Sequence, residues 1–324
     1  MKTMKAARVH EYGDASEIRY DDVPRPRPAF GEVLVRVAAT SFNPTEAALR
    51  AGLLQAFLPL DLPYTLGWDV AGTVAEIGTG AQGFTVGDRV IGRLDSAGAA
   101  AEYVRAPVAM LVAAPVSVPL VNAAALPLAG LTAWQAVFDH GKVAAGQRVL
   151  INGAGGGVGG FVTQIAKYAG AEVIATAGVR SAEAVRRQGA DQVVDYTSMP
   201  VHAALDGPVD VLLNLVPLNP PDAAALAPLV RPGGRIVSIA TPIEPPADAG
   251  VTAMHMVARN DVAHLAALVE LVDAGAVTID ISESHPLAAL PDVHRLSEAG
   301  WTRGKVIIIP PGPGGHLSNA LSTT

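Results

Sequence analysis

The sequence predicts an α/β protein in which a β-rich domain is combined with a domain built on a doubly wound parallel sheet. Three observations support this fold class. The chain of 324 residues is too long for one typical core, so roughly two domains are expected. The pattern of predicted secondary structure changes near residue 120. In VLINGAGGGVG (149–159), five glycines in seven positions follow an apolar run.

The composition limits the partners that the protein can have. Half of the residues are hydrophobic (50%), 16% are charged, and the net charge is -7 without a long block of like charge. A nucleic-acid or membrane-surface protein needs a basic stripe, so neither partner is expected. The chain has no cysteine, which removes disulfides, thiolate metal ligands and thiol catalysis. Neither a signal peptide nor an apolar run of ~18 residues is found, so a cytoplasmic location is expected.

Before residue 120, short strand-like runs are separated by Gly and Pro. The runs are EVLVRVAAT (32–40), DVAGTVAEIG (69–78) and DRVIGRL (88–94). This spacing predicts a mostly antiparallel, barrel-like domain.

After residue 120, predicted strands alternate with predicted helices. The strands cover 148–153, 171–177, 191–196, 210–216 and 233–240, and amphipathic helical segments cover 161–170 and 181–189. Such alternation is typical of βαβ units and a parallel, doubly wound sheet.

The last part of the chain changes character again. HLAALVELVDAG (264–275) has helical apolar spacing, and KVIIIP (305–310) is a strand without a place in the parallel sheet. We expect this strand to return to the first domain, which becomes discontinuous. The tail 311–324 is rich in Pro, Gly and Ser and is expected to be disordered.

The glycine-rich loop lies between a predicted strand and a predicted helix. Gly153, Gly156 and Gly159 have G-x-x-G-x-x-G spacing, a variant of the dinucleotide fingerprint. One glycine allows a tight turn, another allows close approach of a pyrophosphate, and the third lets the helix pack on the strand. A flexible turn is the alternative for the motif alone. The strand before it, the helix after it and the second strand favour dinucleotide binding.

The end of the second strand bears on the choice of nucleotide. An NAD site usually has an Asp or Glu here that binds the ribose 2′-hydroxyl. This strand instead ends with Ala177 and Gly178, followed by Arg180 and Ser181. An arginine and a hydroxyl suit a phosphate monoester, so NADP(H) is the predicted cofactor. The alternative is that Arg180 is an ordinary solvated cation.

Nine stretches, with the glycine loop among them, follow one another along the chain. They are SFNPTEAALRAG (41–52), LPYTLGWDVAGTVAEIG (62–78), VGDRVIG (86–92), AAEYV (100–104), AALPLAGLTAWQAV (124–137), NGAGGGVG (152–159), RQGADQVVDY (187–196), RPGGRIVSIA (231–240) and GKVII (304–308). Each is a weak signal, but in this order they resemble the zinc-independent medium-chain dehydrogenases/reductases of the quinone oxidoreductase type.

The resemblance implies a domain organisation. A GroES-like catalytic domain would consist of residues 1–120 and a returning part, 259–310. A Rossmann domain for the cofactor would be inserted at 121–258. The family places its active site in the cleft between the two domains and commonly forms a homodimer through the Rossmann domain.

The resemblance also implies roles for single residues. Asn43 corresponds to an asparagine beside the nicotinamide and substrate, so it is a candidate amide donor; Glu46 stands where the family usually has Asp. Thr132 corresponds to a threonine near the nicotinamide ribose and Tyr196 to a tyrosine at the 2′-phosphate. Structural alternatives are an N-cap for Thr132 and an edge-strand aromatic for Tyr196. The other expected cofactor contacts are Gly153, Gly156, Gly157, Val158, Gly159, Gly178, Arg180, Ser181, Val216, Ser238, Ile239, Ala240 and Thr241.

The chain departs from the zinc alcohol dehydrogenases of the same superfamily. Those enzymes present a Cys and a Gly-His-Glu stretch to the catalytic zinc, whereas Gly67-Trp68-Asp69 has no His-Glu pair. No metal site is therefore expected. Without a Lewis acid, the easiest hydride acceptors are conjugated, such as a quinone or an α,β-unsaturated carbonyl. The motifs dictate no fixed acid, and solvent is one possible source of the proton, because an enolate takes a proton readily. Tyr64 is the candidate side-chain donor, with a packed structural role as the alternative.

The sequence thus predicts an NADPH-dependent oxidoreductase that reduces a quinone or an α,β-unsaturated carbonyl without zinc. Two alternatives stay open. One is an enoyl-thioester reductase in a biosynthetic pathway, because residues 50–63 are apolar and could border a hydrophobic chain. The other is an NADPH-binding protein with a mainly non-catalytic role.

Overall fold

The computed structural model describes residues 2–312, which form two compact units. The first contains the chain up to Pro127, Glu283–Thr302 and the chain from Val306; the second contains Leu128–Ser282 and Arg303–Lys305. Residues 259–282 therefore lie with the second unit and not with the returning part of the first. Gln135 holds this segment at one end, since it exchanges two hydrogen bonds of 2.9 Å with the Arg259 backbone. Most of the tail expected to be disordered, 313–324, lies outside the described residues.

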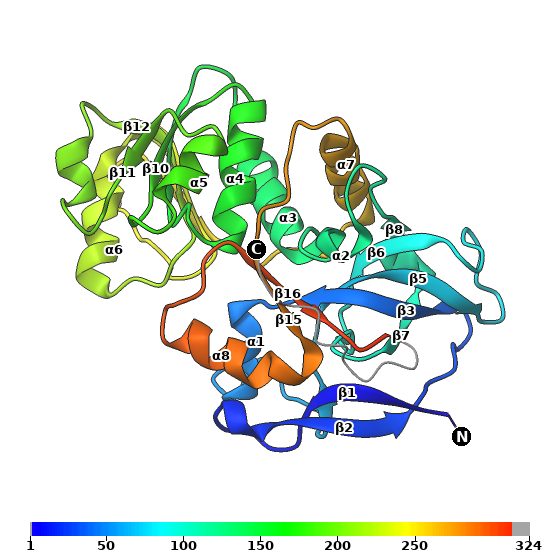
Figure 1. Ribbon diagram of the computed structural model, residues 1–324. Helices are drawn as coiled ribbons and strands as arrows, with labels where there is room; N and C mark the ends of the chain where they lie inside the picture. The colour runs from blue at the N-terminus through cyan, green and yellow to red at the C-terminus, as the bar shows by residue number, and fades with distance from the viewer. Residues whose placement is uncertain (1, 313–324) are drawn as a thin grey trace, which may run out of the picture. The chain divides into compact units, whose positions relative to one another are not determined.

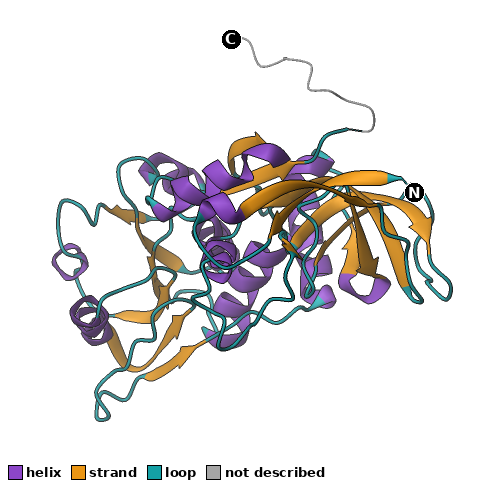
Figure 2. Ribbon diagram, turned by 90° about the horizontal axis from the view of Figure 1, so that it is seen from below, coloured by secondary structure: helices purple, strands orange, loops and turns teal. Residues whose placement is uncertain are grey.

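The first unit is rich in β-structure (Figures 1 and 2), and its strands β1 to β8 pair antiparallel. One sheet has the order β2-β1-β4, and the other has the order β15-β16-β3-β5-β6-β8, with β7 on β3. The strands are β1 Thr3–Val9, β2 Ile18–Pro24, β3 Glu32–Ser41, β4 Tyr64–Thr65, β5 Asp69–Ile77, β6 Arg89–Arg93, β7 Tyr103–Pro107, β8 Leu111–Ala113, β15 Ile281–Pro286 and β16 Lys305–Ile309. The predicted antiparallel character of this region is confirmed.

Alternation along β3 explains why this strand is central. Val33, Val35 and Val37 are separated by one residue each, and all three belong to one buried cluster with Val70 and Val90. Residues two apart in a strand face the same side of the sheet. The sequence pattern of β3 therefore directs one face into the core of the first unit.

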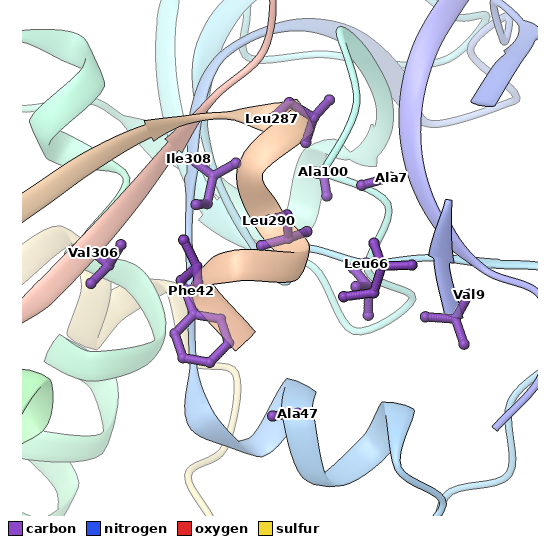
Figure 3. Packing of buried hydrophobic residues seen from close by; sticks show 12 residues of the cluster. Ala7, Val9, Phe42, Ala47, Leu66, Ala100, Leu287, Leu290, Val306 and Ile308 are labelled. Carbon is purple, nitrogen blue, oxygen red and sulfur yellow. The ribbon is translucent and has the colours of Figure 1, made fainter. Parts of the chain in front are cut away.

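The returning strand β16 joins the first unit through β3. Ile307 pairs with Ser41, and the Phe42 N–H donates to the Val306 carbonyl at 2.9 Å. Val306 and Ile308 are buried in a cluster that also contains Phe42 and residues of the helices α1 (Pro44–Arg50) and α8 (Leu290–Glu298) (Figure 3). Burial of these two apolar side chains is the physical reason for the return.

The second unit has a six-stranded parallel sheet with the order β11-β10-β9-β12-β13-β14. Counted from β9, this order is 3-2-1-4-5-6, that of the dinucleotide-binding Rossmann fold. The strands are β9 Arg148–Asn152, β10 Glu172–Thr176, β11 Gln192–Val194, β12 Val209–Asn214, β13 Val230–Ser238 and β14 Thr252–His255. The predicted doubly wound sheet is confirmed.

Helices connect these strands, and α4 and α5 lie next to the sheet (Figure 1). The remaining helices of the chain are α2 Leu120–Ala123, α3 Pro127–Trp134, α4 Gly157–Tyr168, α5 Ala182–Arg187, α6 Pro220–Leu226 and α7 Val262–Asp273. Among the described residues, no helix is both long enough and apolar enough to cross a membrane.

Helix α4 begins four residues before the predicted start at 161. Glycine is a poor helix former, so the pattern of apolar residues places the start after the glycines. In the structure Gly157, Gly159 and Gly160 lie in the first turn, and a β-carbon on Gly157 or Gly159 would lie less than 3.0 Å from a backbone carbonyl oxygen. Close packing therefore outweighs the low helix propensity of these residues.

Candidate cofactor site and active-site residues

The three spaced glycines of the loop after β9 have three different environments. Gly153 has a φ of +96°, which favours glycine, and makes the turn out of the strand. A β-carbon on Gly159 would lie 2.4 Å from the Gly153 carbonyl oxygen, so only glycine lets α4 pack this closely. A β-carbon on Gly156 would meet nothing nearer than that carbonyl, at 3.6 Å, which leaves the backbone accessible. These environments suit the three functions of a dinucleotide loop.

The first turn of α4 provides backbone N–H groups next to Gly156. The Gly160 N–H donates to the Gly156 carbonyl at 3.2 Å. The N–H groups of Gly157, Val158 and Gly159 therefore precede this bond and have no acceptor four residues earlier within the helix. Such N–H groups, together with the helix dipole, favour an anion, and the accessible Gly156 backbone beside them fits a pyrophosphate.

Gly304 and Lys305, at the start of the returning strand β16, contact this loop. The Gly304 N–H donates to the Gly155 carbonyl at 3.1 Å, and Gly304 forms a parallel bridge with Gly156. The side chain of Lys305 packs on Gly157, where a β-carbon would lie 2.7 Å from Lys305 Cδ. The glycine loop is thus held by residues about 150 positions later in the sequence.

The residues expected at the 2′-phosphate surround the turn after β10. The atom nearest to a β-carbon on Gly178 would be the Tyr196 hydroxyl oxygen, at 3.6 Å, so these two residues face each other. Tyr196 is 59% exposed and Arg180 is exposed as well. The Ser181 hydroxyl lies against Gly155 of the glycine loop. A guanidinium, a hydroxyl and a phenol are the groups that suit a phosphate monoester, and Arg180 and Tyr196 are both exposed.

The residues expected at the nicotinamide end follow β12 and β13. Val216 touches the glycine loop, because a β-carbon on Gly153 would lie 2.4 Å from Val216 Cγ1. Ser238 ends the next strand, and Ile239, Ala240 and Thr241 follow it; the Thr241 hydroxyl accepts from the Leu218 N–H at 2.8 Å. The structure therefore brings Val216 to the glycine loop and ties 238–241 to the chain just after Val216.

Thr132 lies inside α3 and is not an N-cap. It is 8% exposed, and its hydroxyl donates to the Leu128 carbonyl one turn earlier at 2.7 Å. The hydroxyl oxygen is the atom that this threonine could offer to a ribose hydroxyl.

Sequence reasoning missed three polar residues of the second unit. Asn152, Thr176 and Asn214 end the otherwise apolar strands β9, β10 and β12, and all are buried. A polar residue at the carboxyl end of each apolar run is the signal that could have identified them, since ligands of parallel sheets bind at this edge.

Asn43 is the residue that precedes α1 in the first unit and is 6% exposed. Its side-chain Nδ2 donates to Asp69 Oδ2 at 2.9 Å and to the Ser41 carbonyl at 3.3 Å. Both partners are acceptors, which fixes the orientation of the amide. An amide hydrogen for a ligand would have to leave one of these bonds, and the longer bond to Ser41 is the weaker of the two.

Glu46, which replaces the usual aspartate, is 3% exposed and bonded to backbone groups. Its carboxylate accepts from the Gly67 N–H at 2.7 Å and from the Asn43 N–H at 3.2 Å. Gly67 has a φ of +93°. The longer side chain of Glu46 therefore connects the start of α1 to the turn at Gly67, whose positive φ favours glycine.

Tyr64 is a half-buried residue of β4 that packs against the core cluster of Figure 3. Burial is the main cause that raises the pKa of its phenol to about 12; a hydrogen bond with Trp68 opposes the shift, and the nearby Glu46 carboxylate adds to it. The phenol is therefore protonated throughout the neutral range, as a proton donor must be.

The stretch Gly67-Trp68-Asp69, which corresponds to the zinc ligands, contains a carboxylate that is bonded to other side chains. Asp69 is fully buried and accepts hydrogen bonds from the Ser41 hydroxyl and the Asn43 amide. Across residues 2–312, no three or more His, Cys, Asp or Glu side chains come together as a group that could hold a metal ion.

Comparison with known proteins places both units in established families. The family model described as "Alcohol dehydrogenase GroES-like domain" matches residues 29–116. The model described as "Zinc-binding dehydrogenase" matches residues 188–308.

Full-length relatives give a closer assignment. The chloroplast envelope quinone oxidoreductase homolog of Arabidopsis thaliana is 33% identical over 95% of this chain and 99% of its own. The chloroplastic NADPH-dependent alkenal/one oxidoreductase of the same plant is 29% identical over 95% of this chain and 80% of its own. A mycobacterial structure solved with NADPH has a TM-score of 0.83 and 29% identity, covering 95% of this chain and 100% of its own. This chain belongs to the quinone oxidoreductase-like medium-chain dehydrogenases/reductases.

Proposed function

We propose that the protein is an NADPH-dependent oxidoreductase that transfers hydride to a quinone or an α,β-unsaturated carbonyl without zinc. The observation that carries this proposal is the glycine loop, followed after β10 by a turn with Arg180 and Ser181 and no carboxylate, with the Tyr196 hydroxyl beside Gly178. The relatives named for quinone and alkenal/one reduction support the same class of substrate.

In this proposal, bound NADPH supplies the hydride, and the residues of the chain bind and orient it. The first-turn N–H groups of α4 hold the pyrophosphate, and Arg180 with Tyr196 holds the 2′-phosphate. Trp68 and Asp69 stand where zinc alcohol dehydrogenases have ligands. The acceptor must therefore accept hydride without a Lewis acid, as conjugated carbonyl compounds and quinones do.

The activity of the purified protein tests the reaction class directly. With NADPH, it is expected to reduce simple quinones and enones at the same rate before and after treatment with a strong chelator, because no step uses a metal. The measurement is NADPH oxidation followed by absorbance. A loss of activity on chelation that added zinc restores would overturn the zinc-free proposal.

A second prediction concerns Tyr64 as the proton donor. The variant Tyr64→Phe is expected to reduce enones on the order of 100-fold more slowly, with little change in KM, because a positioned acid protonates the enolate carbon faster than solvent does. Quinone reduction should change little, since a hydroquinone anion is protonated readily by water. Tyr20→Phe, at an exposed tyrosine of the same unit, is the control. Equal slowing of both substrates would indicate that Tyr64 is structural.

An enoyl-thioester reductase is the second candidate. Leu53 and Phe57, in the apolar segment 50–63, are 76% and 88% exposed, and an acyl chain could cover such side chains. Turnover of acyl thioesters without turnover of free quinones would favour this candidate. Binding of NADPH without turnover of any substrate would instead favour a non-catalytic role. The homodimer and the cytoplasmic location remain predictions.

A further inference from the structure

Four polar side chains are buried at the carboxyl ends of four neighbouring strands of the parallel sheet. The strands β10, β9, β12 and β13 are adjacent in that order, and they end with Thr176, Asn152, Asn214 and Ser238. These side chains are between 0% and 8% exposed. A buried polar group without a hydrogen bond costs free energy, so partners for these groups are required.

The first half of a hydrogen-bond chain runs from the glycine loop to β12. The backbone N–H of Gly153 donates to Thr176 Oγ1 at 2.9 Å. Thr176 Oγ1 donates to Asn152 Oδ1, and Asn152 Nδ2 donates to Asn214 Oδ1, each at 2.9 Å. The turn out of β9 is therefore bonded through side chains to the end of a strand on the other side of β9.

The second half continues to the loops expected at the nicotinamide end. Asn214 Nδ2 donates to Ser238 Oγ at 2.9 Å and to the Val216 carbonyl at 3.1 Å. The Ser238 hydroxyl in turn donates to the Thr241 carbonyl. The hydrogen-bond chain therefore ends on two loops, the one after β12 and the one after β13.

The backbone groups at the two ends are consistent with one direction for every bond in this hydrogen-bond chain. The Val216 carbonyl can only accept, so Asn214 presents its amide nitrogen to Val216 and Ser238 and its amide oxygen to Asn152. Asn152 must then donate to Asn214 and accept from Thr176, whose hydroxyl gives its hydrogen to Asn152 and accepts from the Gly153 N–H. All links therefore point the same way, an arrangement in which each bond strengthens the next.

We infer that Thr176, Asn152, Asn214 and Ser238 are positioning residues that couple the glycine loop to the loops after β12 and β13. This inference rests on the proposed function, since the two ends of the chain are the expected sites for the two halves of NADPH. The geometry of one half-site then depends on a side chain at the other, several hydrogen bonds away.

The test uses ligands that represent each half of the cofactor, 2′,5′-ADP and reduced nicotinamide mononucleotide. Ser238→Ala removes the last hydroxyl of the chain, and Thr176→Val removes the first. We expect Ser238→Ala to weaken 2′,5′-ADP binding and Thr176→Val to weaken mononucleotide binding, each about 3- to 10-fold, the effect of one lost hydrogen bond. The measurement is the dissociation constant of each ligand by calorimetry, with thermal unfolding to verify the fold.

The double variant and two further variants make the test specific. The double variant is expected to lose less affinity than the product of the single losses, because the chain is already broken. Thr176→Ser keeps the hydroxyl and should retain the parent affinity for both ligands. Thr278→Val removes a hydroxyl that bonds to Gln164 in the same unit but does not belong to the hydrogen-bond chain. This variant should change neither dissociation constant.

The outcomes separate this inference from the proposed function. If each variant weakens binding only of the ligand at its own end, the coupling is absent although NADPH binding stands. The same conclusion follows if the losses of affinity multiply in the double variant. If the parent protein binds neither NADPH nor the two fragments, the proposed function fails, and the positioning role fails with it.

Discussion

Between pH 6.5 and pH 3, the parent protein is expected to lose on the order of 4 kcal/mol of unfolding free energy that the variant His294→Phe retains. His294 belongs to α8 and is 1% exposed. Its ring lies edge-on to Phe42 with 4.9 Å between the ring centroids. Its Nδ1 atom has no hydrogen-bond partner among the described residues.

The electrostatic surroundings of His294 keep its imidazole neutral. Burial, together with the smaller effect of the positive charge of Arg50, lowers the pKa of His294 to about 3. Arg50 is itself fully buried, paired with Glu298 and bonded to the Gly13 carbonyl. An imidazolium here would have neither water nor an acceptor at Nδ1, which explains the direction of the shift.

The sign of the pH effect follows from the two pKa values. The folded value of about 3 lies below the unfolded value near 6.5, so the unfolded chain takes up the proton first as the pH falls. The contribution of His294 is therefore complete above pH 6.5 and decreases by up to about 1.4 kcal/mol per pH unit towards pH 3.

Denaturant unfolding at a series of pH values between 7 and 4 measures this effect. The difference in unfolding free energy between the parent and His294→Phe should change steadily with pH below 6.5, because phenylalanine keeps the aromatic packing without a titratable group. The same change at His202, which is exposed, provides the control and should leave the slope unchanged. Parallel pH profiles for the parent and His294→Phe would refute the assignment.

Local sequence patterns were sufficient to predict the second unit. The apolar run at 148–153 and the glycine spacing after it predicted β9 and the loop, because a parallel strand is buried on both faces and a pyrophosphate needs glycines. Two mistakes came from the same kind of pattern. Glycines at 157–160 hid the start of α4, and the helical spacing at 264–275 could not show which unit this helix joins.

The contacts between distant segments could not be predicted from local patterns. The bond from Gly304 to Gly155 joins positions about 150 residues apart, and the Thr176 to Asn152 bond depends on the order of strands in the sheet. The same limit applies to Asn43. The family resemblance implied an amide donor for a ligand, whereas its bonds to Asp69 and Ser41 depend on the folded backbone.

The cofactor preference is expected to respond strongly to two residues after β10. Replacing Arg180 by Ala should weaken NADPH binding by about 1.5 to 3 kcal/mol, the usual range for a hydrogen bond to a charged group, and leave NADH binding almost unchanged. The preference for NADPH should thus fall tenfold or more. Arg186→Ala, at an exposed arginine of α5, is the matched control and should affect neither cofactor.

The variant Gly178→Asp should change the preference further. A β-carbon fits at this position, since its nearest neighbour would be the Tyr196 hydroxyl oxygen at 3.6 Å. The introduced carboxylate would repel the 2′-phosphate of NADPH and accept a hydrogen bond from the ribose hydroxyl of NADH. Dissociation constants of both cofactors for the parent and the three variants provide the measurement. If Arg180→Ala weakens the binding of both cofactors equally, Arg180 only supports the loop. If the parent protein prefers NADH, the assignment of the 2′-phosphate site is refuted, because the turn at Gly178 would then bind the ribose of NADH without a carboxylate.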